Sequence, residues 1–140
     1  MQALVASLLL LVLIKPSVAA ITPQVFVSFS MPTHLLEETL SESARLHIPA
    51  ILNGLVDNSM PKTMKQIEVL SKTVPNLNLQ IDPTAFERFG IRQVPALVVD
   101  NGHDFDVLYG NLSLREGLMR IAGNGDSGFS VEDARRLIGD

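Results

Sequence analysis

Short segments with the composition of strands alternate with segments of helical periodicity, and this order limits the possible folds more than any other feature of the chain. The strand-like segments are rich in β-branched, aromatic and aliphatic residues and comprise residues 25–29, 50–52, 77–81, 96–99 and 105–109. A helical segment follows each of the first three, and the last two strands follow one another before a final helix. We therefore predict an α/β fold in which helices flank a mixed central sheet.

The helical segments are recognised by apolar residues that recur every three or four positions and by capping residues. The first helix carries Leu36, Leu40 and Ala44 and ends near residue 46. The buried stripe of the second is predicted to comprise Met64, Ile67, Leu70 and Val74. A short third helix begins at Asp82, with Phe86 and Phe89 facing inward, and a fourth begins at Ser113.

The C-terminal third of the chain contains a tight turn and several glycines. Asn101 and Gly102 favour a hairpin, so the last strand is predicted to run antiparallel to the strand before it. Glycine-rich residues 123–128 are typical of a spacer. We therefore predict one domain over residues 21–123 and a flexible tail over residues 124–140, in which Ser130 could cap a short helix.

The N-terminus has the pattern of an export signal. Residues 3–14 are almost continuously apolar, but a bilayer-spanning helix requires about 20 such residues. Pro16 and the small residues Ser17, Ala19 and Ala20 end the run. We predict a cleaved signal peptide over residues 1–20 and no stable membrane span afterwards; since no Lys or Arg precedes the run, a buried N-terminal helix is the alternative.

Composition excludes several classes of function. The chain has 0 cysteines, and the thiolate is the nucleophile and metal ligand of cysteine chemistry. Net charge is −4, with no Trp and one Tyr, which argues against a nucleic-acid partner. His34, His47 and His103 lack metal-ligand spacing. No catalytic triad or phosphate-binding loop is evident, so we expect neither an enzyme nor a metal or cofactor site.

Residues 89–99 resemble the thioredoxin superfamily, in which a cis proline precedes a central strand. Here the matching pair is Val94 and Pro95. The resemblance implies a thioredoxin-like fold without redox cysteines. Two loops could occupy the position of the redox motif, namely residues 30–33 and residues 58–61, and the longer, more aromatic strand before the first favours it.

A narrower resemblance covers most of the chain after the predicted signal. Four blocks, residues 26–32, 53–60, 81–83 and 94–97, are similar to the TrbC family of F-type conjugative transfer systems. That family is implicated in pilin assembly, which implies a periplasmic protein and protein–protein contacts. Members commonly have Arg before the Gly-Leu pair of the second block, whereas this chain has Asn53, so a role of that charge does not transfer.

The thioredoxin-like resemblance also implies a site. In such folds the backbone beside the cis proline pairs with an extended peptide, as in strand addition to a sheet. The candidate partner-binding groove comprises Ser30, Met31, Pro32, Thr33, Gln93, Val94 and Pro95. Two interpretations compete with it: Met31 could be a core residue, and Ser30 could cap the following helix or, as in glutathione-using relatives of the fold, bind a thiolate.

The function favoured by these patterns is a non-enzymatic periplasmic assembly factor for a conjugative pilus or type IV secretion system. Its expected partners are other periplasmic transfer-system and pilus assembly proteins, with pilin a candidate among them. The alternative is a redox-inactive thioredoxin-like chaperone or adaptor of the periplasm, unrelated to conjugation. An enzyme that uses Ser30 is a more distant third hypothesis.

Overall fold

The computed structural model describes residue 14 and residues 20–139. The predicted signal peptide, residues 1–20, therefore lies outside the described residues except at Ile14 and Ala20. Within the described part, no helix is both long and apolar enough to cross a membrane.

A five-stranded mixed sheet forms the centre of the molecule, with strand order β3-β2-β1-β4-β5. The strands are β1 (Thr22–Val27), β2 (Ala50–Leu52), β3 (Leu79–Ile81), β4 (Ala96–Asp100) and β5 (Phe105–Tyr109). The first three are parallel, β4 runs antiparallel to β1, and β5 antiparallel to β4. This confirms the predicted mixed sheet and the predicted C-terminal hairpin.

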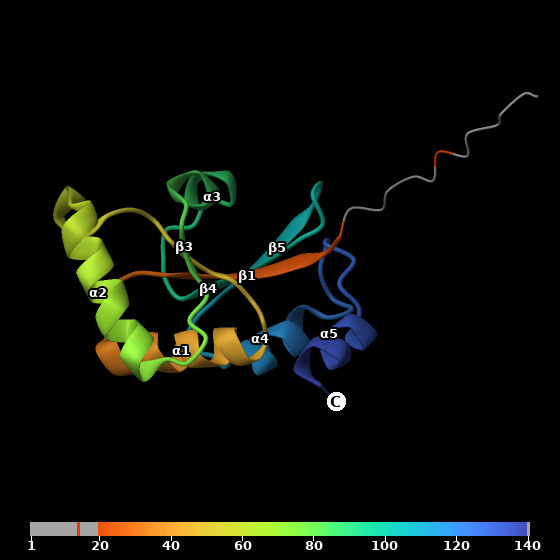
Figure 1. The fold of residues 1–140 in the computed structure, drawn as a ribbon. Coiled ribbons are helices and arrows are strands. Elements are labelled where there is room, and N and C mark those ends of the chain that lie inside the picture. The colour runs from red at the N-terminus through yellow and green to blue at the C-terminus, as the bar shows by residue number, and fades with distance from the viewer. Residues whose placement is uncertain (1–13, 15–19, 140) are drawn as a thin grey trace, which may run out of the picture.

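Helices cover both faces of the sheet (Figure 1). They are α1 (Thr33–Arg45), α2 (Met60–Thr73), α3 (Pro83–Arg88), α4 (Leu114–Ile121) and α5 (Val131–Ile138), with a 3₁₀ turn η1 (Val56–Asn58) before α2. In Figure 1, α3 lies above the sheet and α1, α4 and α5 lie below it, while α2 and α5 stand at opposite ends of the molecule.

Alternation along β1 divides the core into two clusters, because successive side chains of a strand point to opposite faces. Val25 and Val27 belong to the larger cluster, together with Leu40 of α1 and Leu118 of α4. Phe26 belongs to the smaller cluster beneath α3. There it contacts Phe86 and Phe89 edge to face, with ring centroids 4.8 and 5.9 Å apart, which confirms the inward orientation predicted for both rings.

The first strand begins and ends earlier than predicted. It covers residues 22–27 rather than 25–29, because residues 22–24 already pair with residues 98–100 of β4. The chain then turns at Ser28, whose carbonyl accepts a hydrogen bond from Met31 N at 3.1 Å. The third strand begins at Leu79 rather than at residue 77.

The buried face of α2 differs from the predicted stripe. Met64 is 51% exposed, whereas Thr63 and Leu70 are buried. A polar residue can occupy the buried face because the Thr63 hydroxyl donates to Ser59 O at 2.7 Å and accepts from Val56 N at 2.8 Å. The prediction for Met64 was therefore wrong, since it assumed that only apolar residues mark the inner face.

The C-terminal segment is anchored, in contrast to the flexible tail that we expected over residues 124–140. The helix that Ser130 caps is present as α5, but Phe129 and Ala134 are 3% and 0% exposed within the larger core cluster. Asp106 of β5 also accepts hydrogen bonds from the backbone N–H groups of Asp126 and Ser127, at 2.8 and 3.0 Å. Glycine-rich composition suggested a spacer, whereas these contacts fix the segment against the sheet.

Candidate functional site

The loops that follow the parallel strands meet at one end of the sheet. Phe26 of β1 lies opposite Ala96 of β4, so continuing the antiparallel register brings Ser28 opposite Val94. The loop after β1 and the loop before β4 are therefore neighbours. This supports residues 30–33 as the segment at the redox-motif position, because residues 58–61 follow β2, which β1 separates from β4.

The loop from Ser28 to Pro32 folds on itself rather than capping α1. The hydroxyl groups of Ser28 and Ser30 are 2.8 Å apart, and Ser30 N donates to Ser28 Oγ at 3.1 Å. The residue at the N-cap of α1 is Pro32, and no side chain caps this helix. The interpretation of Ser30 as an N-cap was therefore wrong: its hydroxyl pairs with Ser28, and the helix begins two residues later than that role requires.

The seven predicted groove residues do not share one hollow. Met31 is 7% exposed and packs in the larger core cluster, which confirms the core interpretation of this residue, although it also lines a groove with Thr33. Val94 and Pro95, joined by a cis peptide bond, are half-buried and buried. Pro95 lines a different, small cavity. The remaining candidates, Ser30, Pro32 and Gln93, are exposed.

A first hollow, of about 390 Å³, lies between the loops after β1 and β2, with Phe29 and Leu55 among its lining residues. Residues 53–56 contribute one wall, and the chain leaves that wall through Asp57 and Asn58, whose φ angles of 48° and 53° are in the left-handed region. Thr63 fixes this wall through its bond to Val56 N. The sequence analysis did not identify Thr63. The pattern that could have indicated its role is the spacing of four residues between Ser59 and Thr63, which places the hydroxyl near the carbonyl of Ser59.

A second hollow, the α1–α2 groove, has a volume of about 350 Å³ and lies between the first half of α1 and the middle of α2. Its apolar lining consists of Phe29, Met31, Leu36, Val69 and Leu70. Glu37 of α1 and Lys65 of α2 also line it. Sequence reasoning found Met31 but missed Val69 and Lys65, because it oriented α2 around Met64.

The residues with shifted pKa values lie elsewhere. Burial raises the pKa of the Asp106 carboxyl, but hydrogen bonds from the Ser127 side chain and from two backbone N–H groups outweigh it, and the pKa is lowered. Hydrogen bonds from Ser130 likewise lower the pKa of Asp133. Both carboxylates are hydrogen-bonded to the C-terminal segment. Among the described residues, no group of three or more His, Asp or Glu side chains could hold a metal ion.

A family model matches residues 25–124 and is described as "Type-F conjugative transfer system pilin assembly protein". The chain belongs to this family. The matched region begins within β1 and ends after α4, so it contains both hollows, whereas α5 lies outside it.

A curated relative agrees with the family assignment. The chain is 42% identical over 101 residues to "Periplasmic protein TrbC" of Escherichia coli (strain K12). The alignment covers 72% of this chain but only 48% of the relative, so the chain spans about half the length of the family member it matches.

A solved structure, "Structure of MTB dsbF in its mixed oxidized and reduced forms", is 18% identical to the chain. The superposition covers 74% of this chain and 80% of the chain of that structure, with a TM-score of 0.49.

Proposed function

We propose that the chain is a non-enzymatic periplasmic assembly factor for a conjugative pilus or type IV secretion system. The observation that carries this proposal is the match of residues 25–124 to the family of pilin assembly proteins. The match covers nearly the whole sheet and the helices α1 to α4, so it concerns the domain as a folded unit rather than a single motif.

The expected periplasmic location agrees with the printed name of the relative that is 42% identical. It also agrees with the predicted export signal over residues 1–20. A chain with 0 cysteines performs no thiol–disulfide exchange in that compartment, because the exchange requires a thiolate. We therefore propose that its role in assembly comes from binding other proteins.

The surface proposed for binding is the end of the sheet where β1, β2 and β3 terminate. The predicted groove residues lie there, from Ser30 to Thr33 after β1 and from Gln93 to Pro95 before β4. The hollow beside Phe29 and the α1–α2 groove open at the same end. Other transfer-system proteins, with pilin among them, are the proposed partners.

Crosslinking in donor cells followed by purification of the tagged protein from the periplasm tests this function. We expect pilin or other transfer-system proteins among the crosslinked species. If the crosslinked species are unrelated exported proteins, and remain the same when the transfer genes are absent, the general chaperone or adaptor is the better account.

A further inference from the structure

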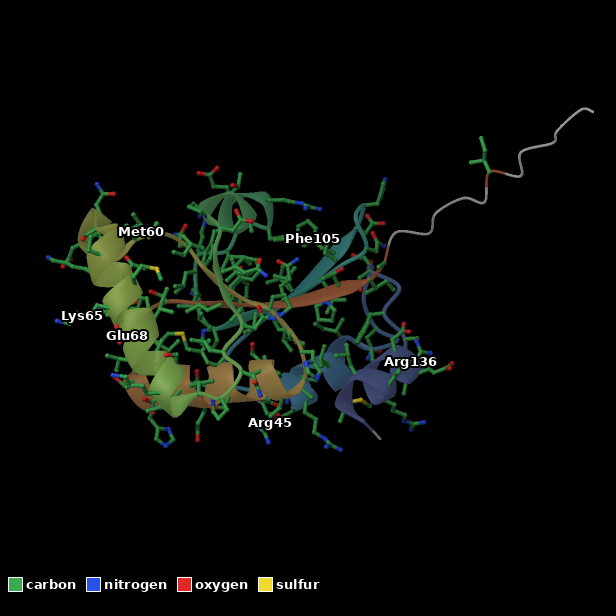
Figure 2. All side chains as sticks on the ribbon, in the orientation of Figure 1. Arg45, Met60, Lys65, Glu68, Phe105 and Arg136 are labelled. Atoms are coloured by element: carbon green, nitrogen blue, oxygen red, sulfur yellow. The ribbon has the colours of Figure 1, made fainter. Side chains whose placement is uncertain are left out.

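Only a small part of the surface of helix α2 is buried against the rest of the domain. It has 14 residues, of which only Thr63 and Leu70 are buried. Three of its large apolar side chains face solvent: Met60 and Met64 are about half exposed, and Val69 is 58% exposed. Lys65 projects from this helix at the left edge of the molecule in Figure 2.

The α1–α2 groove combines an apolar floor with walls of opposite charge. Val69 and Leu70 on one side face Met31 and Leu36 on the other. Lys65 and Glu37 line opposite walls. Neither forms an ion pair with another described residue, so both charges are available to a partner.

The lysines outside the predicted signal peptide are Lys62, Lys65 and Lys72, and all three are on α2. Lys62 is paired with Asp57 at 3.2 Å, and Glu68 lies between the other two, so the positive charge in the groove comes from Lys65. The first half of α1 carries Glu37 and Glu38. A segment bound in the groove would therefore meet the positive charge of Lys65 on one flank and the negative charge of Glu37 on the other.

From this arrangement we infer that the α1–α2 groove binds an amphipathic helix of a partner protein, with acidic side chains on one flank and basic side chains on the other. The groove volume of about 350 Å³ is near the lower end of the range for binding pockets, about 300–1,000 Å³. It suits the few anchoring side chains of a helix that binds in a groove. Complementary flanks fix the direction in which that helix lies.

An anionic membrane surface is the competing occupant, since basic helices with exposed apolar residues bind such surfaces. The acidic wall of α1 opposes it, because Glu37 would face the lipid phosphates across the same groove. The inference rests on the proposed function, since it names the chemistry of the partner that an assembly factor binds.

Selection from a displayed library of amphipathic helices tests the inference. The library fixes the apolar stripe and randomises both flanks between Glu and Lys, and the target is the exported protein. We expect helices with Glu on one flank and Lys on the other, whereas Lys65→Glu should select Lys on both flanks. Flank charges that are unchanged by Lys65→Glu would overturn the inference, as would failure to enrich any helix.

Two further variants locate the binding site. Val69→Asp should weaken the selected helices by about tenfold or more, because it places an unpaired carboxylate in an apolar contact. Met119→Asp is the matched control, since Met119 is an apolar residue of α4 that is 38% exposed, and it should leave binding unchanged. Equal effects of the two substitutions would contradict the groove.

Vesicles of anionic phospholipid test the competing occupant. If they bind the wild-type protein and lose binding with Val69→Asp, while no displayed helix is enriched, the groove binds membrane instead. Pilus formation in donor cells that express each variant distinguishes failure of the groove inference from failure of the proposed function. If it requires the protein but tolerates Val69→Asp, the groove inference fails and the proposed function stands.

Discussion

The two ends of the molecule differ from what their sequences suggest, in opposite directions. The helix α2 has an apolar stripe typical of a core helix, yet it exposes Met64 and Val69. The C-terminal segment has the glycine-rich composition of a spacer, yet Phe129 and Ala134 are buried. Hydrogen bonds to Asp106 then fix its loop to β5.

The comparison shows that the two ends contribute differently to the core, and the proposed role of α2 would separate recognition from stability. The C-terminal segment lies outside the matched family region, which ends at residue 124, and its side chains complete the core. The α2 helix lies inside that region and contributes little to the core, so its surface is available for a partner. Substitutions at the two ends should therefore have different consequences, and each prediction below tests one side of this contrast.

The largest effect on stability is expected for Phe129→Ala at the anchored end. Loss of this buried ring should lower the free energy of unfolding by about 3–5 kcal/mol, because the side chain is enclosed in the larger core cluster. Met64→Ala on α2 is the control and should change it by less than about 0.5 kcal/mol. Urea unfolding followed by circular dichroism measures both, and similar losses for the two variants would refute the contrast.

A smaller loss is expected for Gly125→Ala. A Cβ at this position would clash with the carboxylate of Asp106, so the carboxylate must move and give up its hydrogen bonds to the backbone. We expect a loss of about 1–3 kcal/mol, measured by urea unfolding. Gly54→Ala is the matched control, since a Cβ there would meet no other part of the protein within 4 Å; an equal loss there would show that the effect is not specific to Asp106.

The pH dependence of stability should reveal the Asp106 contacts. Since folding lowers the pKa of this carboxyl, its contribution is present above the unfolded pKa of about 3.9 and is lost as the pH falls through the folded-state pKa. Near neutral pH, Asp106→Asn should therefore have a lower free energy of unfolding than wild type, and the loss should be smaller than that caused by Gly125→Ala. This difference between Asp106→Asn and wild type should disappear below about pH 4.

Urea midpoints measured between neutral and acidic pH test this prediction. The control is Asp104→Asn in the same hairpin, because within residues 20–139 the carboxylate of Asp104 accepts no backbone hydrogen bond and pairs with His103. A gap between wild type and Asp106→Asn that stays constant with pH would mean that the bonds to the loop do not depend on its charge.

The smallest effect on stability is expected for Val69→Asp, the substitution with the largest expected effect on binding. Val69 is 58% exposed, so the free energy of unfolding should change by less than about 0.5 kcal/mol. Thermal unfolding of the purified variant provides the measurement. A loss comparable to that of Phe129→Ala would show that α2 is as much a part of the core as the C-terminal segment.

The order of elements could be predicted from the sequence because it depends on local patterns. Alternation and turn residues located all five strands, and Ser130 correctly marked the start of α5. The orientation of α2 could not be predicted, because it depends on the two hydrogen bonds of Thr63 to residues on the loop before the helix. A buried polar residue of this kind cannot be recognised from the spacing of apolar residues in the sequence.

The candidate site was predictable only in part, for a similar reason. The loop before α1 and the pair Val94 and Pro95 were proposed from a resemblance to thioredoxin-like proteins, and they remain a prediction. The α1–α2 groove joins Met31 to Val69, which are distant in the sequence and meet only after α2 has packed. The anchoring of residues 126–127 by Asp106 likewise depends on a tertiary contact, so composition alone suggested a flexible tail.

The central claim, that this domain assembles pili by binding at its α2 end, is tested most directly in donor cells that lack the protein. Pili and DNA transfer should be restored by the wild-type chain and by Met119→Asp, but not by Val69→Asp present at the same periplasmic level. Full restoration by Val69→Asp would contradict the claim for the α2 end. Unimpaired pili and transfer in cells without the protein would contradict the assembly function itself.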